Sequence, residues 1–321
     1  MYLMNICLIG LGHIGALLND NKDISKTHLS QILKLKELKI VGLIESNKAV
    51  VKKVLKKYKK ENLSIIDSYS NLNFDKLDII VLATPPNDRL NTIRDILKKK
   101  QKPKFIFFEK PLANCYKDGL KIISLLNRNK IKYYVNYIRN WDKDIISFFS
   151  GIKKSDVKHI NVVYSKGFLN SSSHYLYELI KKFGNVDLKN LHLFEKNSYK
   201  NMKNYSFFTN LGKIPTLFQG LKYLPKENDY LELSIYCKNS LYEIKSSGVV
   251  KKKYSSKKNN FYDKFIALNH HEDYKKISIV NGLSNGYKHI INVIKNRENF
   301  FFKNIEISLE ILKINDELEK Q

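Results

Sequence analysis

The chain has 321 residues, of which 43% are hydrophobic and 12% aromatic, so its composition excludes a disordered polypeptide and allows two globular domains. The formal net charge is +26, yet only five of the basic residues are arginine, and the lysines are spread along the whole chain. Because specific base contacts and bidentate phosphate clamps favour arginine, this charge predicts a solvated lysine surface and no nucleic-acid site. Three scattered cysteines without a C-x-x-C pair are typical of a reducing cytoplasm.

The first predicted element is a buried strand that runs into a glycine-rich turn. The stretch Asn5–Gly15 reads NICLIGLGHIG, and its apolar run Ile6–Ile9 suits a strand of a parallel sheet. Gly10, Gly12 and Gly15 form a G-x-G-x-x-G motif directly after this strand. In that context Gly10 allows the tight turn, Gly12 lets the backbone approach a pyrophosphate, and Gly15 allows close packing.

The residues after the turn are expected to open a helix. The segment 16–18 (Ala-Leu-Leu) follows Gly15, and a helix that starts there presents free N–H groups to an anion. We therefore expect the turn to bind a dinucleotide, with His13 and Ile14 among the contacts. An ordinary turn is the alternative interpretation, because glycine triplets also occur in such turns.

An acidic residue closes the second predicted strand. A polar insert, Asn19–Lys26, precedes a helical pattern over Leu29–Leu35 and a buried strand over Lys39–Ile44, which Glu45 follows. This position predicts a hydrogen bond to the adenosine ribose, and the insert explains why Glu45 lies later than the usual offset of about 20 residues. An acid repels a 2′-phosphate, so NAD is favoured over NADP, although Lys48 weakens the preference. An exposed glutamate at a strand end is the alternative interpretation.

Strands and helices then alternate, and the third long strand ends at a proline corner. Thr84, Pro85, Pro86 and Asn87 close the apolar strand Asp78–Ala83, and the two prolines stop both strand and helix. The alternation predicts a parallel, doubly wound sheet with ligands at its carboxyl edge. The other predicted elements of this part are the helices Ala49–Tyr58, Leu90–Leu97 and Leu120–Leu126, and the strands Ile65–Ile66, Phe105–Phe108 and Tyr133–Tyr137.

The second part of the chain reads mostly as alternating strands. A strand over Val157–Tyr164 and a helix over Gly167–Gly184 come first, and the following segments suit one open, mainly antiparallel sheet. The lysine-rich stretch Lys251–Asn260 is interpreted as a solvated turn, and Asp273–Ile294 and Ile305–Leu318 as helices. The predicted strands of the sheet are Leu191–Glu195, Tyr205–Thr209, Tyr230–Tyr236, Leu241–Ile244 and Phe261–Ala267.

These elements predict an α/β chain of two domains. Residues 1–128 are expected to form a Rossmann dinucleotide-binding domain, and residues 129–321 an α+β domain for substrate binding and oligomerisation. The C-terminal helix is long enough to pack back on the first domain. No run is apolar enough to span a bilayer, and no spaced set of cysteine, histidine and carboxylate residues predicts a metal site. The apolar N-terminal run leads straight into the glycine turn and is not expected to be a signal peptide.

Four pieces of sequence together resemble a known family. GLGHIG (residues 10–15), ATPPN (83–87), FFEKPLA (107–113) and NSSSH (170–174) occur in order. This set resembles the Gfo/Idh/MocA family of nicotinamide-dependent oxidoreductases, over most of the chain and most strongly in the first half. The E-K-P triplet is its most specific piece. The resemblance implies a Rossmann domain and a second domain whose open sheet often forms the oligomer interface, so we expect a homodimer or homotetramer.

The resemblance also implies roles for individual residues near the cofactor. Lys110 of the E-K-P triplet would lie beside the nicotinamide and the reacting hydroxyl. Glu109 and the proline corner 84–87 would lie near the same cofactor. Lysine is common in this chain, so without its Glu109 and Pro111 neighbours Lys110 would carry no signal.

Two further pairs are implied near the substrate. Asn170 and His174 lie four residues apart, so they share one face if the segment is helical. Histidine is the usual acid–base candidate, because the pKa of imidazole lies near working pH. Tyr137 and Arg139 match the place where the family often has an aromatic or polar residue followed by arginine. Helix capping or packing is the alternative role of His174.

Two departures from the family pattern shape the functional hypothesis. The family often has histidine where this chain has Arg89, and many of its dehydrogenases have aspartate where this chain has Asn170. Asparagine does not ionise, so a proton relay would have to end at His174 or Lys110. Some sugar-acting members of the family also carry asparagine at this position, so the resemblance implies a sugar or nucleotide-sugar substrate over inositol. We expect an NAD(P)-dependent oxidoreductase that acts on a carbinol of such a substrate, in the biosynthesis of surface carbohydrates. A catalytically silent, nucleotide-binding regulatory or scaffold protein is the alternative.

Overall fold

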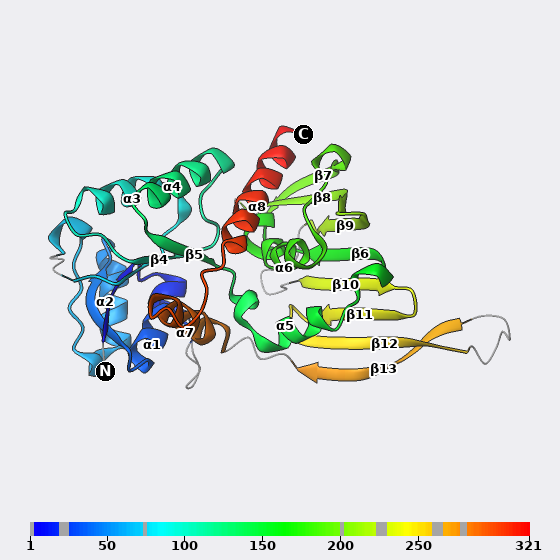
Figure 1. Ribbon diagram of the computed structural model, residues 1–321, viewed down its shortest axis with the longest axis horizontal. Helices are drawn as coiled ribbons and strands as arrows, with labels where there is room; N and C mark the ends of the chain where they lie inside the picture. Colours follow the sequence, from blue (N-terminus) through cyan, green and yellow to red (C-terminus); the bar gives the residue numbers. More distant parts are fainter. Residues whose placement is uncertain are drawn as a thin grey trace. The chain divides into compact units, whose positions relative to one another are not determined.

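The computed structural model describes residues 3–18, 26–72, 76–199, 202–222, 230–258, 266–276 and 281–321 (Figure 1). Two compact units share the chain. The first comprises Met1–Trp141 and Val280–Leu312, and the second comprises Asp142–Ile279 and Lys313–Gln321. Of the predicted polar insert Asn19–Lys26, all but Lys26 lies outside the described residues. None of the described helices combines the length and the apolarity that crossing a bilayer requires.

A parallel sheet of five strands forms the centre of the first unit, in the order β2-β1-β3-β4-β5. Its strands are β1 (Met4–Ile9), β2 (Leu38–Ile44), β3 (Ile79–Leu82), β4 (Phe105–Glu109) and β5 (Lys132–Asn136). All of β3 and β4 is buried, which explains why their sequences are apolar runs and not alternating patterns. The predicted parallel, doubly wound sheet is confirmed.

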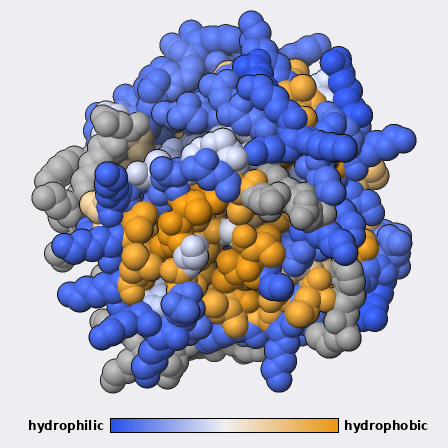
Figure 2. All heavy atoms as spheres, turned by 90° about the vertical axis from the view of Figure 1, so that its left-hand side faces the viewer, coloured by the Kyte–Doolittle hydropathy of each residue, from blue (hydrophilic) through white to orange (hydrophobic). Residues whose placement is uncertain are grey.

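Helices cover both faces of this sheet. In Figure 1, α3 (Arg89–Lys98) and α4 (Tyr116–Arg128) lie on one face, and α1 (His28–Lys34) and α7 (Gly282–Ile294) on the other. The helix α2 (Lys48–Lys57) follows β2. One core cluster joins side chains of β1, β4, α1 and α7, among them Leu8, Phe107, Leu29 and Tyr287. Figure 2 shows that apolar side chains also gather on one face of this unit, within a hydrophilic surround.

Three local predictions for the first unit were wrong. No long helix starts after Gly15: a five-residue π-helical turn, His13–Leu17, ends at Leu18, whose ψ of 127° is not helical. The predicted strand at residues 65–66 is a single bridge from Ile66 to β2, which is the edge strand of the sheet among the described residues. The predicted helix Asp273–Ile294 begins only at Gly282, because residues 273–276 pair as a strand of the second unit.

A mixed sheet of eight strands forms the second unit, in the order β13-β12-β11-β10-β6-β9-β8-β7. Only β6 and β9 pair in parallel, and the other neighbours are antiparallel, so the predicted open and mainly antiparallel sheet is confirmed. The strands are β6 (Val157–Tyr164), β7 (His192–Tyr199), β8 (Met202–Leu211), β9 (Ile214–Gly220), β10 (Leu231–Cys237), β11 (Ser240–Lys245), β12 (Val250–Lys258) and β13 (Ile266–Lys276).

Two strands of this sheet were not expected. The lysine-rich stretch 250–258 is the strand β12 and not a solvated turn. Lys251, Lys252 and Lys253 are half-buried there, because long aliphatic stems can cover a sheet while the ammonium groups reach solvent. The strand β9 was missed because Pro215 interrupts its pattern, although alternate residues from Ile214 on are buried. Of the predicted strand Phe261–Ala267, residues 261–265 lie outside the described residues.

Three helices complete the chain: α5 (Lys143–Ser150), α6 (Ser173–Phe183) and α8 (Lys303–Lys320). The first half of α8 belongs to the first unit, where the Asn304 amide binds both the N–H and the carbonyl of Val135 on β5. Its last turns belong to the second unit, where Glu319 accepts from Lys203 of β8 at 2.5 Å.

Candidate functional site

The glycine turn leaves one open position beside its backbone. A Cβ on Gly10, whose φ is +91°, would lie 2.9 Å from the carbonyl carbon of Ala83, and a Cβ on Gly15 would lie 2.1 Å from the Gly10 oxygen. Both positions therefore require glycine for packing. Around Gly12, no atom of the described residues comes within 4 Å of such a Cβ. The backbone there is accessible to an approaching group, as a pyrophosphate requires.

Glu45 braces the same turn from the end of β2. Its Oε2 accepts from the backbone N–H of Leu11 at 2.9 Å, and its Oε1 accepts from the N–H of Asn47 at 2.9 Å. A carboxylate has about four acceptor positions, so both oxygens retain capacity for a ribose hydroxyl. The side chain is half-buried and fixed, which suits the predicted contact. His13 is exposed and Ile14 half-buried in the π-helical turn.

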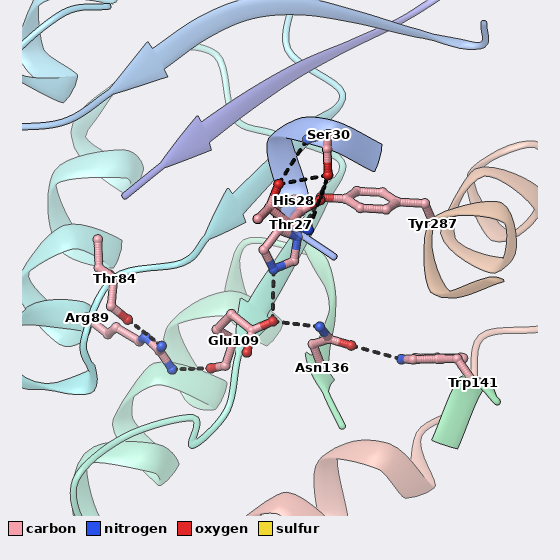
Figure 3. Close-up of polar contacts among 9 residues, drawn as sticks. All are labelled: Thr27, His28, Ser30, Thr84, Arg89, Glu109, Asn136, Trp141 and Tyr287. Atoms are coloured by element: carbon pink, nitrogen blue, oxygen red, sulfur yellow. Dashed lines mark hydrogen bonds and ion pairs between the residues drawn. The ribbon is translucent and has the colours of Figure 1, made fainter. Parts of the chain in front are cut away.

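The carboxylate of Glu109, at the end of β4, is the centre of a buried polar network (Figure 3). His28 Nε2 lies 2.8 Å and Asn136 Nδ2 lies 2.6 Å from its Oε1. His28 Nδ1 lies 2.7 Å from the Tyr287 hydroxyl, and the Trp141 indole donates to the side-chain oxygen Oδ1 of Asn136 at 3.2 Å. Burial by itself raises the pKa of Glu109, but the hydrogen bonds and charge of His28 and the Asn136 amide outweigh it and lower that pKa.

Local sequence explains why these groups meet. Thr27 and Ser30 form a capping box, which fixes the start of α1 and makes His28 its first residue. Because an ionised carboxylate only accepts, Nε2 of His28 carries the hydrogen of that bond. The other ring nitrogen, Nδ1, is bonded to the Tyr287 hydroxyl: a neutral ring accepts there and a protonated ring donates. Four elements, α1, β4, β5 and α7, are thus joined at Glu109.

Arg89, the first residue of α3, joins the proline corner to the E-K-P turn (Figure 3). Its Nη1 donates to the carbonyl oxygens of Glu109 and Pro111, and its Nη2 donates to the carbonyl oxygen of Thr84. The side chain is fully buried. Burial lowers the pKa of Arg89 to about 10 against the opposing effect of Glu109, so the guanidinium stays charged at neutral pH.

Lys110 lies between the two carbonyls that Arg89 binds, and the peptide bond to Pro111 is cis. The residue is partly exposed, while its ammonium is largely enclosed by protein. Burial lowers the pKa of Lys110 to about 8; the Glu109 carboxylate opposes this effect, and the charges of Arg139 and Arg89 add to it. At neutral pH Lys110 is therefore protonated in most molecules and neutral in roughly a tenth of them.

Tyr137 and Arg139, the residues implied near the substrate, are both buried. Burial raises the pKa of Tyr137, although the hydroxyl of Ser308 on α8 and the charge of Arg89 partly offset it, so the phenol is neutral. Arg139 lies close enough to Lys110 to influence its pKa. Within the first unit, Arg139 and Lys110 therefore belong to one charged cluster.

Asn170 and His174 lie in the second unit, at the start of α6. A π-helical turn, Phe168–Ser172, runs directly into α6, so the two residues share a helical segment as expected. Asn170 is exposed and His174 half-buried. The nearby serines do not cap the helix: Ser172 and Ser173 bond back to carbonyls four residues earlier, at 2.9 and 2.8 Å.

Sequence reasoning missed His28, Asn136 and Tyr287, and treated Arg89 only as a departure. One available signal was position, since Asn136 ends β5 at the same edge of the sheet at which Glu109 ends β4. No pattern in the sequence pointed to His28 or Tyr287, which lie 81 and 178 positions from Glu109. No group of three metal-binding side chains occurs within the described ranges.

Comparison with protein-family models matches residues 4–137 to a family described as an oxidoreductase family with an NAD-binding Rossmann fold. No curated protein matches the chain by sequence.

Three solved structures similar to this chain indicate its fold. The WlbA dehydrogenase from Bordetella pertussis, in complex with NADH and UDP-GlcNAcA, has a TM-score of 0.73 at 13% identity over 99% of this chain and 96% of its own. UDP-N-acetylglucosamine 3-dehydrogenase GnnA from Acidithiobacillus ferrooxidans has a TM-score of 0.72 at 10% identity, over 98% and 96%. A super-repressor mutant of Gal80p from Saccharomyces cerevisiae has 0.73 at 14%, over 99% and 95%.

Proposed function

We propose that the protein is a dehydrogenase or reductase of a sugar-derived substrate, because residues 4–137 match the Gfo/Idh/MocA model of NAD-binding oxidoreductases. It moves a hydride between nicotinamide and a carbinol carbon, in carbohydrate biosynthesis in the cytoplasm. The observation that carries this proposal is the E-K-P turn, which presents a lysine of lowered pKa at the carboxyl edge of a sheet whose glycine turn leaves Gly12 open.

We propose that the dinucleotide binds along that edge. Gly10, Gly12, His13, Ile14 and Gly15 would contact its pyrophosphate, with Gly12 giving the close approach. Glu45 would accept from the adenosine ribose, and the corner residues Thr84, Pro85, Pro86 and Asn87 with Glu109 would border the nicotinamide half. A carboxylate at Glu45 repels a 2′-phosphate, which favours NAD over NADP.

The proposed chemistry needs a proton carrier beside the reacting hydroxyl. A bound nicotinamide supplies the hydride acceptor for oxidation and the hydride donor for reduction. In the direction of oxidation, His174 takes the hydroxyl proton, and the ammonium of Lys110 donates a hydrogen bond to the oxygen that becomes the carbonyl. Asn170 holds a substrate hydroxyl without exchanging a proton. In the direction of reduction, the same proton returns from His174.

The proposed substrate class follows from chemistry and from relatives. Of the similar structures, GnnA is a UDP-N-acetylglucosamine 3-dehydrogenase, and WlbA is a dehydrogenase in complex with NADH and UDP-GlcNAcA. Arg139, in the charged cluster with Lys110, and Tyr137 would define the sugar side of the site. The excess of lysine also favours attraction of an anionic, nucleotide-linked substrate. We propose a homodimer or homotetramer for the assembled enzyme.

Binding and turnover can be measured separately. Titration with NADH and NADPH followed by fluorescence, and turnover on a panel of UDP-sugars and free sugars, test the two steps. Lys110→Met is expected to lower kcat by at least about 100-fold with little change in NADH affinity. Lys117→Met, at an exposed position of α4, is the matched control and should act as wild type. Failure to bind either dinucleotide contradicts the proposal.

A regulatory protein of the same fold is the second candidate. It is favoured by Asn170, which cannot ionise, and by the similarity of fold to the Gal80p super-repressor. This candidate predicts that NADH binds but that no sugar is turned over at any pH. Turnover that depends on Lys110 would dismiss it.

A further inference from the structure

We propose that Arg89 is a positioning residue that fixes the backbone on both sides of Lys110 and so sets where the lysine ammonium lies at the edge of the sheet. The inference deepens the proposed function, because it concerns the same lysine. The hold on the backbone itself is independent of any reaction and can be measured without substrate.

Three backbone carbonyl groups bind the guanidinium of Arg89. Nη1 of Arg89 binds the carbonyls of Glu109 and Pro111, the residues directly before and after Lys110. Nη2 binds the carbonyl of Thr84, which follows β3. One planar group therefore ties the turn after β4 to the turn after β3, the strand beside it. A shift of the Lys110 backbone would break bonds on both of its sides.

Only arginine meets this geometry. Its guanidinium has five donors in a rigid fork and no acceptor, so it can bind three carbonyl oxygens at once. A lysine has three donors on a single atom, and a histidine ring has at most two, pointing apart. The guanidinium also stays charged at working pH despite its burial, so these donors do not change with pH.

The lysine that Arg89 positions, Lys110, lies among charges of both signs. The charged groups that influence Lys110 are the Glu109 carboxylate, which favours the ammonium, and Arg139 and Arg89, which oppose it. The Glu109 carboxylate is itself held by His28 and Asn136. Glu109 is thus fixed at its side chain by one set of residues and at its carbonyl by Arg89.

Two variants of Arg89 separate the effect of its forked donor geometry from the effect of its positive charge. Arg89→Lys keeps a cation but loses the fork, and Arg89→Gln loses both the fork and the cation. Arg94→Gln is the matched control, because Arg94 lies on the same helix, is exposed and donates to the side chain of Asn91 at 3.1 Å. The measurements are hydrogen exchange of the segment 105–115 in the full chain without ligand, the NADH Kd, and the pH profile of kcat.

Both Arg89 variants are expected to speed exchange in the segment 105–115 at least tenfold and to lower kcat at least tenfold, with the NADH Kd within threefold of wild type. The pH midpoint of Lys110 should rise in Arg89→Gln and stay in place in Arg89→Lys, which a purely structural role would not produce. Arg94→Gln should match wild type. Unchanged exchange in Arg89→Lys overturns the inference, even if Arg89→Gln does not fold. If the wild type turns over no substrate, the proposed function fails while the exchange data still decide this inference.

Discussion

Replacing His28 by leucine should destabilise the first unit by several kcal/mol. His28 has no exposed surface and bonds two partners, Glu109 Oε1 at 2.8 Å and the Tyr287 hydroxyl at 2.7 Å. Leucine has a similar volume, so the change removes hydrogen bonds and creates little cavity. Removing one partner of a buried charge costs about 3–5 kcal/mol, and a buried hydroxyl left without its partner costs about 1–3 kcal/mol. Since Asn136 still holds Glu109, we expect a total of about 3–5 kcal/mol.

The chain offers a probe for this unit alone. Its one tryptophan, Trp141, belongs to the first unit and bonds Asn136 in the same network. Urea unfolding followed by tryptophan fluorescence at pH 7 therefore reports the free energy of unfolding of the first unit. His192→Leu, at an exposed position in β7, is the control and should change stability by less than about 0.5 kcal/mol.

A double-mutant cycle tests whether the cost comes from the charge on Glu109. In the Glu109→Gln background no buried carboxylate depends on His28, so His28→Leu should cost only about 1–2 kcal/mol there. The difference between the two backgrounds measures the coupling. If His28→Leu costs the same in both backgrounds, or less than about 1 kcal/mol in the wild type, the bond between His28 and the Glu109 carboxylate does not stabilise the fold.

Three further outcomes are expected, at the glycine turn, at Glu109 and at Lys110. Gly12→Ala should leave the Tm unchanged and weaken NADH binding at least tenfold, because a Cβ there fills open space, whereas Gly15→Ala should prevent folding through its 2.1 Å contact; calorimetry and NADH titration check both. The pKa of Glu109 is lowered in the folded state, so its stabilisation is present above its unfolded pKa of about 4.3 and is lost as the pH falls through the folded value; urea midpoints should drop on acidification, and Glu109→Gln should flatten that drop. Burial lowers the pKa of Lys110 to about 8, and the proposed role of Lys110 needs its ammonium form. In the direction of oxidation kcat should therefore fall as the pH rises through about 8, and Lys110→Met should remove this fall; a fall that persists in the variant belongs to another group.

Elements with strong local signals were predictable. The apolar runs that became β1, β3 and β4 are buried on both faces, so their sequences alone indicate buried parallel strands. The E-K-P triplet was found because it directly follows such a run. The strand β12 was not predictable, because its lysines look like a solvated loop and become half-buried only when β11 and β13 pair on either side.

The network around Glu109 was hidden for a different reason. Periodicity reveals which face of an element is buried, but not which distant residue meets it there. His28 and Arg89 are 81 and 20 positions from Glu109, and each looks like an ordinary polar residue at a helix start. Their role exists only after β3 and β4 have paired and α1 has packed on the sheet.

A sequence motif specifies which residue occupies a turn, but not the pKa or the position of its side chain. The E-K-P triplet identifies Lys110, but a lysine in water keeps a pKa above 10 and samples many positions. Its lowered pKa and its place depend on burial, on Arg139 and on Arg89, none of which belongs to the triplet. A chain could therefore keep the triplet and lose its chemistry through a change at Arg89 alone, and the Arg89 variants would distinguish an active enzyme from a silent relative with the same motif.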